Sequence, residues 1–223
     1  MNILQLLADS FLKILLPGIK VTIPLTVISF TLSLLIGTMV ALVQFANIRI
    51  LKSVARFYIW VIRGTPLLIQ LFVVFYGLPS VGVIIDPFPA AVIVFSINEG
   101  AYNAETIRGA LESIPKGQIE AGYCCGLSFL QVMWYIVLPQ ALRVAFPSLA
   151  NSLIAMVKNT SLAANITVME MFMATQRIVA RTYEPLALYL EVALIYLMFS
   201  TLLTWLQRWG ERRLAAKGGG AHA

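Results

Sequence analysis

A run of 28 residues without a charged side chain, Val21–Ile48, constrains the fold of this chain more than any other feature. A helix needs roughly 20 mostly apolar residues to cross the hydrocarbon core of a bilayer. The overall composition agrees, because 60% of the 223 residues are hydrophobic and only 12% are charged. A soluble domain carries about 25% charged residues. The sequence therefore predicts an integral membrane protein.

Four further runs are long and apolar enough to predict spanning helices, so the expected fold is all-α and transmembrane with about five spans. The third and fourth of the five runs contain charged side chains, and the helix of the second is compatible with a start near Ser53. The four runs are Gly64–Ile85, Pro89–Arg108, Ile136–Val157 and Pro185–Gln207.

Residues 1–20 are expected to form a lead-in to the first span. From Ile3 to Leu16 the pattern is that of a short amphipathic helix, and Pro17 followed by Gly18 is expected to end it. We interpret this segment as an interfacial helix at the membrane surface. It lacks the basic region and the small-residue cleavage site of a secretory signal peptide, so we expect no cleavage.

The distribution of basic residues predicts the orientation of the chain. Lys and Arg concentrate at the cytoplasmic ends of spanning helices. Eleven of the 16 Lys and Arg residues lie in three segments: near the start of the second span, between the third and fourth spans, and after the fifth span. These three segments are on one side of the membrane, and the other five Lys and Arg residues are on the opposite side. The N-terminus is therefore expected outside and the C-terminus in the cytoplasm.

Several kinds of chemistry are not expected in this chain. The one histidine, His222, lies in the segment 214–223, which is expected to be a disordered tail, and the adjacent Cys124 and Cys125 do not have zinc or redox spacing. No phosphate-binding loop sequence occurs. We therefore expect no metal site and no catalytic residues, which argues against an intramembrane enzyme. A self-sufficient secondary transporter or channel for small solutes is one alternative function that such a membrane chain leaves open.

The stretch EAGYCCGLSFLQVMWYIVLP, between the third and fourth runs, interrupts the apolar pattern. A short helix is expected at about 116–128, where Ala121 and Gly122 leave room for another backbone to approach. Gly126 is expected to end this helix with a positive φ, and Pro139 to occupy the first turn of the next helix. We interpret the short helix as a cytoplasmic docking surface for a soluble partner.

This stretch resembles the EAA motif of importer permeases of the ATP-binding cassette (ABC) superfamily, in which Glu-Ala-Ala is followed at fixed spacing by Gly and by Ile-x-Leu-Pro. Gly122 departs from the third-position alanine but keeps the residue small. The segments RGTPLLIQLF, AYNAETIRGAL and KNTSLAANI are similar to those of the polar amino acid uptake branch, which includes histidine, glutamine and cystine permeases. The resemblance covers the expected permease domain, residues 21–213. It assigns coupling to Glu120, Ala121, Gly122, Gly126, Leu138 and Pro139.

The resemblance implies a type I ABC importer permease, a multi-pass protein of the bacterial cytoplasmic (inner) membrane. It implies a second permease subunit, identical or paralogous, two ABC ATPase subunits and an extracytoplasmic substrate-binding protein as partners. The ATPase subunits would bind ATP and magnesium, so this chain would need no cofactor. The lipid bilayer surrounds such a chain, and no nucleic acid is expected. The implied mechanism is alternating access, in which the ATPase subunits move the spans as rigid bodies.

Polar side chains inside the third and fourth spans are the candidates for a substrate site. A carboxylate at the bilayer centre costs about 3 kcal/mol, so its presence there needs a reason. Residues three and four apart share one face of a helix, and two such polar faces would surround a zwitterionic amino acid, whose ammonium needs a carboxylate and whose carboxylate needs donors. The candidate substrate residues are Asn98, Glu99, Tyr102, Glu105, Ser152 and Asn159.

Each of these residues also has a structural interpretation. Glu105 is three residues from Arg108 and can form an ion pair within its own helix. Asn98 and Asn159 can join helices by hydrogen bonds, and Glu99 can belong to a buried structural pair. The resemblance implies that permeases for basic amino acids carry acidic residues where this chain has Ser152 and Asn159. Cystine, glutamine or an acidic amino acid is therefore favoured over a basic one.

Overall fold

The computed structural model describes residues 3–46 and 49–216, and all regular structure within them is helical. Three short elements are π-helical (η1, η2 and η4) and two are 3₁₀-helical (η3 and η5). In chain order the elements are α1 (Ile3–Pro17), η1 (Gly18–Thr22), α2 (Ile23–Phe45), α3 (Arg49–Arg63), α4 (Leu67–Phe72), η2 (Val73–Gly77), η3 (Leu78–Val81), α5 (Pro87–Glu112), α6 (Lys116–Cys124), α7 (Phe129–Val132), η4 (Met133–Val137), α8 (Leu138–Asn159), η5 (Thr160–Ile166), α9 (Met171–Thr182) and α10 (Pro185–Ala216).

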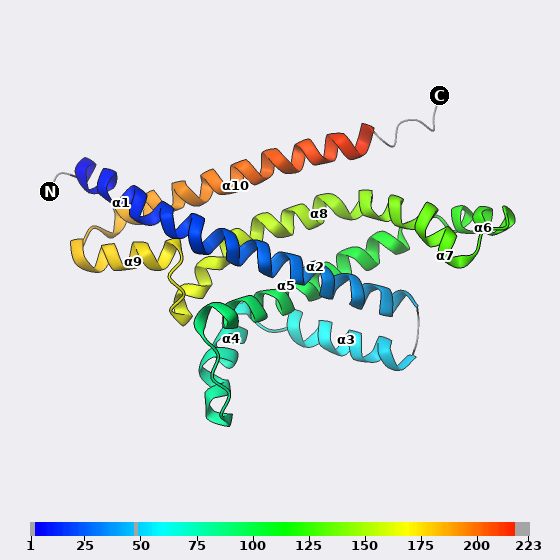
Figure 1. Ribbon diagram of the computed structural model, residues 1–223, viewed down its shortest axis with the longest axis horizontal. Coiled ribbons are helices and arrows are strands. Elements are labelled where there is room, and N and C mark those ends of the chain that lie inside the picture. The colour runs from blue at the N-terminus through cyan, green and yellow to red at the C-terminus, as the bar shows by residue number, and fades with distance from the viewer. Residues whose placement is uncertain (1–2, 47–48, 217–223) are drawn as a thin grey trace.

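The long helices run along the longest axis of the molecule (Figure 1). The start of α1 lies at one end together with α9, whereas α6, α7 and the C-terminal end of α10 lie at the other (Figure 1). The end of α2 that leads to α3 lies at this second end too. The segments that the basic residues assign to the cytoplasm are therefore grouped in space, while the side that faces the cytoplasm stays a prediction.

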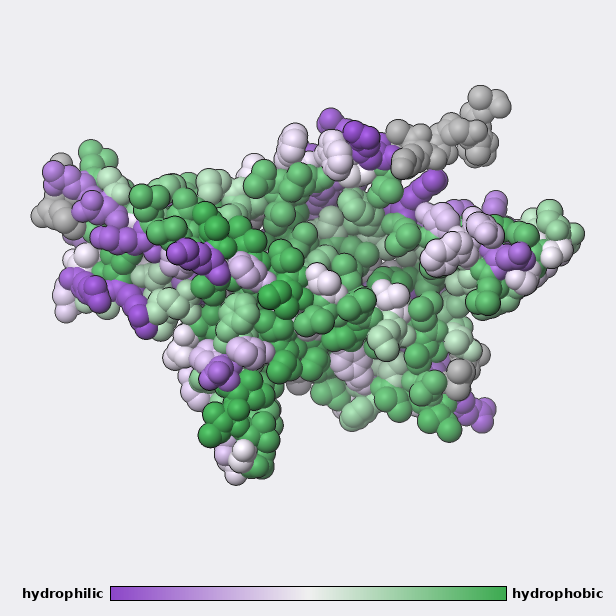
Figure 2. Space-filling view, viewed as in Figure 1, coloured by the Kyte–Doolittle hydropathy of each residue, from purple (hydrophilic) through white to green (hydrophobic). Residues whose placement is uncertain are grey.

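Helix α2 turns small and polar side chains inward and large apolar side chains outward. Its buried face repeats every four residues through Ser29, Ser33, Gly37 and Ala41. This is the reverse of a soluble helix and suits a lipid surround, in which small residues mediate helix packing. Figure 2 shows apolar residues over most of the long helices, with hydrophilic residues gathered toward the ends. The exposed large side chains of α2 are Ile23, Val27, Ile28, Leu32, Leu35, Met39 and Leu42.

Helices α2 and α5 make the most extensive contact of any two described elements. A Cβ placed on Gly37 would lie 2.8 Å from the Cβ of Asn103 and 3.0 Å from the backbone N of Ala104. The buried Asn103 Nδ2 donates to Ser33 Oγ at 3.0 Å. Small residues that let backbones approach, reinforced by an interhelical hydrogen bond, are the means by which helices associate where lipid supplies no hydrophobic drive.

The sequence predicted that the helix beginning at Ile3 ends at Pro17 and Gly18, and this prediction is wrong. It continues through η1 into α2 as one helix of 43 residues, Ile3–Phe45. A π-helical turn follows the proline, and the N–H of Ile23 donates to the carbonyl of Gly18, a local adjustment by which membrane helices accommodate proline. A Cβ on Gly18 would lie 2.6 Å from Met171 Sδ, so close packing of α9 supports the helix at this point.

The second predicted span, Gly64–Ile85, is a broken helix. Helix α3 ends at Arg63, α4 begins at Leu67, and the two segments are bent by 101°. Pro66, between them, has extended backbone with ψ 136°. The residue before a proline disfavours the α region, because the proline ring crowds its backbone. The proline therefore favours a break, and the extended backbone of Pro66 ends the helical path here.

Within the described residues, three helices are long and apolar enough to cross a bilayer, or four if the bent pair is one span. They are Ile3–Phe45, Phe129–Ile166 and Pro185–Leu214. Helix α5 has 26 residues but carries polar side chains near its middle. It packs against α2, α3 and α8, so those side chains face neighbouring helices or the space between them. The count of about five spans is reached when α5 is included.

The fourth span is longer than the predicted run Ile136–Val157. It begins at Phe129 after a capping box, in which Ser128 Oγ accepts from the N–H of Gln131 and Gln131 Oε1 accepts from the N–H of Ser128. Pro139 lies in the first turn of α8, as the sequence predicted, but α8 does not start anew after a loop. It follows the π-helical turn η4 inside a continuous helix of 38 residues.

Two further differences concern the C-terminal part. Helix α9 was not predicted; its N-terminus is capped by the buried Glu170, whose carboxylate accepts from the N–H groups of Phe172 and Met173. Helix α10 continues to Ala216 and so enters the segment 214–223 that was predicted as a disordered tail. The rest of that segment lies outside the described residues.

The contact between α2 and α5 predicts the effect of Gly37→Ala. The added methyl group meets the backbone of α5 and should cost about 1–3 kcal/mol by overpacking, which lowers the melting temperature by about 2–12 °C for a chain of this size. The measurement is thermal unfolding of the purified protein in detergent. Gly109→Ala is the matched control, because nothing lies within 4 Å of a Cβ at that position of α5. An unchanged melting temperature for Gly37→Ala would contradict the packing.

Candidate functional site

A cavity of about 920 Å³ opens between α5, α8 and the break that separates α3 from α4. All six candidate substrate residues line it. Asn98, Glu99, Tyr102 and Glu105 come from α5, whereas Ser152 and Asn159 come from α8. The structure thus brings the two polar faces together around one space, and the role of each residue there stays a prediction.

Glu99 and Ser152 connect the two helices across the cavity. The Ser152 hydroxyl lies in hydrogen-bonding reach of the Glu99 carboxylate, and both side chains are partly buried. No Lys or Arg pairs with Glu99 in any ion pair of the described residues. Its carboxylate therefore keeps the capacity to accept hydrogen bonds from a cationic group in the cavity.

Asn98 helps to fix the break between α3 and α4. Its Nδ2 donates to Gln70 Oε1 at 3.0 Å, and Gln70 Nε2 donates in turn to the Ile62 carbonyl at 2.8 Å and to Thr65 Oγ1 at 2.8 Å. The interhelical role that the sequence left open for Asn98 is thus present. Gln70 was not among the predicted residues, although a lone glutamine in the apolar segment RGTPLLIQLF is the signal that could have found it.

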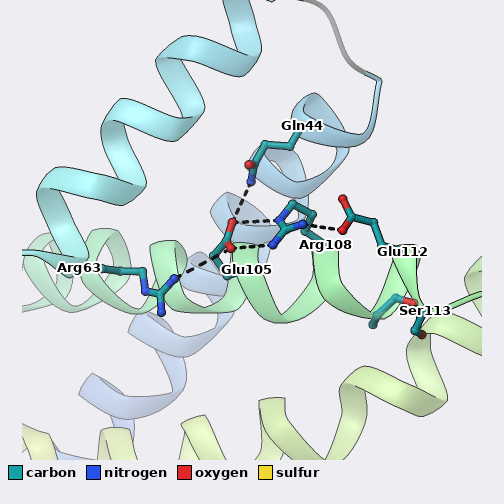
Figure 3. A network of polar contacts seen from close by, with 7 residues as sticks. Gln44, Arg63, Glu105, Arg108, Glu112 and Ser113 are labelled. Carbon is teal, nitrogen blue, oxygen red and sulfur yellow. Dashed lines mark hydrogen bonds and ion pairs between the residues drawn. The ribbon is translucent and has the colours of Figure 1, made fainter.

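Glu105 forms the ion pair within α5 that was predicted from the sequence as its alternative role. Arg108 Nε and Nη2 donate to the two carboxylate oxygens at 3.1 and 2.9 Å (Figure 3). Gln44 Nε2, from α2, donates to Glu105 Oε1 at 3.3 Å, and Arg108 Nη1 also donates to Glu112 at 2.6 Å. This bidentate pairing occupies most of the accepting capacity of Glu105.

Arg63 joins this network from the other side of the cavity. Its Nη1 lies 4.0 Å from Glu105 Oε2, and its guanidinium carbon lies 5.1 Å from the centre of the Tyr102 ring. Figure 3 shows Arg63 reaching Glu105 from the end of α3, and Arg108 reaching the same carboxylate from within α5. Sequence reasoning did not select Arg63 or Gln44 for this site, because both partners come from elements far away in the chain.

The cavity has the character of a polar binding site. Its lining includes one guanidinium, two carboxylates, hydroxyls and amides. No group of three or more His, Cys, Asp or Glu side chains suited to a metal ion occurs among the described residues. The arrangement can bind a small polar molecule through charge and hydrogen bonds.

The predicted coupling segment forms a separate surface at the end of the molecule. Helix α6 projects there (Figure 1), with Glu120 and Ala121 exposed. Gly126 has φ +78° and ends the helix, as predicted. Its N–H donates to the Tyr123 carbonyl at 2.9 Å and that of Leu127 donates to Gly122 at 3.1 Å, which together form a Schellman motif.

Gly122 lies on the buried side of α6. A Cβ there would lie 2.8 Å from Ile136 Cδ1 and 2.9 Å from Val132 Cγ2. The absence of a side chain lets α6 rest directly on α7 and η4, which explains why glycine stands where the motif has alanine. Leu138 is half-buried beneath this contact and Pro139 is exposed.

The amino-acid sequence matches the family described as binding-protein-dependent transport system inner membrane component over residues 33–216. It is 46% identical over 211 residues to the L-cystine transport system permease protein TcyB of Bacillus subtilis (strain 168), covering 94% of this chain and 90% of that protein. It is 38% identical over 205 residues to the glutamine transport system permease protein GlnP of Escherichia coli (strain K12), covering 91% of this chain and 94% of that protein.

The fold is similar to that of a solved amino acid ABC transporter, crystallised with histidines. The TM-score is 0.88 at 32% sequence identity, covering 96% of this chain and 99% of that chain. A chain of the inward-facing MetNI methionine ABC transporter has a TM-score of 0.70 at 18% identity, covering 95% and 97%, and this second likeness concerns the fold alone.

The contact between Asn98 and Gln70 predicts non-additive stability effects. Asn98→Leu and Gln70→Leu each leave the partner's polar groups unpaired, so the double variant should lose less than the sum of the two by about 0.5–3 kcal/mol. Thermal unfolding of the four proteins measures this coupling. Asn98→Leu combined with Gln140→Leu is the control, because Gln140 Nε2 donates to the Ile136 carbonyl of its own helix. Additive effects of Asn98→Leu and Gln70→Leu would contradict the hydrogen bond between the two side chains.

Proposed function

Since this chain belongs to the family of binding-protein-dependent transport system inner membrane components and is a permease of an amino-acid ABC importer, we propose that it couples ATP hydrolysis in a partner subunit to alternating access of its cavity. The expected fold class, an all-α transmembrane permease of a type I importer, is confirmed. The protein is a component of the inner membrane. Its relatives are transport components and not enzymes in themselves.

The exposed face of α6 supports the coupling role. It lies away from the cavity, at the end of the molecule where the helices α2, α5 and α10 also end (Figure 1). An ABC ATPase that grips this short helix moves α7 and α8 with it, because α6 rests on Val132 and Ile136 at the position of Gly122. The coupling residues are those of the motif: Glu120, Ala121, Gly122, Gly126, Leu138 and Pro139.

The cavity is the proposed route of the cargo. A second permease subunit, identical or paralogous, closes its open side, two ATPase subunits bind ATP and magnesium, and an extracytoplasmic binding protein delivers the amino acid. Permeases named for L-cystine and glutamine are 46% and 38% identical to this chain. The lining is polar, and Ser152 and Asn159 add no negative charge to it. Cystine, glutamine or an acidic amino acid is therefore proposed ahead of a basic one.

The proposed cargo is tested with the complete complex in liposomes. The permease, its ATPase and its binding protein are reconstituted, and ATP hydrolysis is measured with each amino acid in turn. We expect stimulation by L-cystine or L-glutamine above that by L-arginine or L-lysine. Equal stimulation by all amino acids, or stimulation by basic ones alone, would reject the substrate class. Hydrolysis without any amino acid dependence would reject the cargo altogether.

Gly126→Val tests the coupling surface in the same complex. Valine is disfavoured at φ +78° by roughly 1–2 kcal/mol or more, so the end of α6 should change shape and ligand-stimulated ATPase activity and uptake should fall about tenfold or more, while the subunits still co-purify. Gly117→Val, within α6, is the matched control: a Cβ at either glycine has open space around it, and of the two only Gly126 has a positive φ. Wild-type uptake and stimulation in Gly126→Val would contradict the docking role.

A further inference from the structure

The cavity contains one positively charged side chain, that of Arg63. Among the described residues that line the cavity, Arg63 is the one Lys or Arg, and the same lining carries the carboxylates of Glu99 and Glu105. It is the last residue of α3, directly before the break, and its side chain is 43% exposed. The broken helix therefore places a guanidinium at the wall of the cavity.

The guanidinium of Arg63 is held in position without a hydrogen bond to a carboxylate. The ring of Tyr102 lies 5.1 Å from it and orients it through a cation–π contact. Its nearest approach to a carboxylate, 4.0 Å to Glu105, is much longer than the two hydrogen bonds of 2.9 and 3.1 Å that Arg108 makes with that group. A guanidinium has five N–H donors, so donors remain for a molecule in the cavity.

The charged side chains that line the cavity differ in the partners they have. Both carboxylate oxygens of Glu105 accept hydrogen bonds from Arg108, which also donates to Glu112. Among the described residues that line the cavity, Arg63 and Glu99 are the cation and the anion without a charged partner at hydrogen-bonding distance. Glu99 lies three residues from Tyr102, on which Arg63 stacks, and three residues rise about 4.5 Å along a helix. A small molecule that carries a carboxylate and an ammonium on the same carbon can reach both groups.

We propose that Arg63 binds the α-carboxylate of the transported amino acid while Glu99 binds its α-ammonium. This assignment rests on the proposed role of the cavity as the cargo route. Guanidinium and carboxylate form two parallel hydrogen bonds, which fix orientation as well as charge. Arg63 and Glu99 then bind the two charged groups that every amino acid has. The cargo side chain therefore meets uncharged amides and hydroxyls, such as Asn151, Ser148 and Asn159. The site thus favours a polar side chain without net charge.

The test compares free amino acids with their methyl esters, which lack the α-carboxylate charge. Binding of L-glutamine and L-cystine, of their methyl esters, and of L-aspartate and L-glutamate to the purified permease–ATPase complex is measured by calorimetry. The wild-type complex should bind the acids at least tenfold more tightly than the esters. Arg63→Gln should weaken binding of the acids by roughly 10- to 100-fold and leave that of the esters within twofold, and Arg63→Lys should be intermediate. Arg56→Gln, also in α3 but outside the cavity lining, should match the wild type.

Three outcomes would overturn the assignment. Equal weakening of acids and esters in Arg63→Gln would show a structural role only. Unchanged acid binding would show no role, and weakening confined to L-aspartate and L-glutamate would show that Arg63 binds a side-chain carboxylate. A wild-type complex that binds amino acids but fails these comparisons rejects the role of Arg63 alone. A wild-type complex that binds no amino acid rejects the proposed cargo, and the role of Arg63 with it.

Discussion

The close contact between α2 and α5 is the interaction on which the rest of the structure depends. Lipid gives helices no hydrophobic reason to associate, so they need close packing and buried hydrogen bonds. Gly37 supplies the space and Ser33 accepts from Asn103 across the contact. Helix α5 is thereby enclosed by other helices and can carry the polar residues that a lipid-facing helix could not. The cavity exists because α5 is protected in this way.

The cavity and the exposed helix α6 are connected through the same two long elements. Near α6, the end of α5 packs with η4 and the start of α8 in one apolar cluster that includes Leu111, Val137 and Ala141. Farther along, α5 and α8 carry Glu99 and Ser152 into the cavity. A displacement of α6 by a partner is therefore transmitted to the cavity wall through packed helices, which move as rigid elements and not by gradual deformation.

The charged side chains of the cavity differ in whether other protein groups already surround them. Two carboxylates look equivalent in the sequence of α5, but Arg108 and Gln44 surround Glu105 whereas Glu99 meets a serine hydroxyl. The difference arises because Arg108 lies one turn further along the same helix and Gln44 lies on α2. Arg63, the last residue of α3, is the cation of the cavity lining that remains available to bind a negatively charged group.

The sequence by itself determined the membrane character, the approximate positions of the spans and six of the residues that line the cavity, because apolar length, helical spacing and the position of charges are local properties. It also located the glycine that ends α6, since a positive φ there needs glycine. Only the tertiary structure decided that the helix continues through Pro17, that the second run breaks at Pro66, and that Arg63 and Gln70 belong to the site. Packing of α9 against Gly18 and hydrogen bonds between distant segments decided these points, and neither is encoded in any single stretch of sequence.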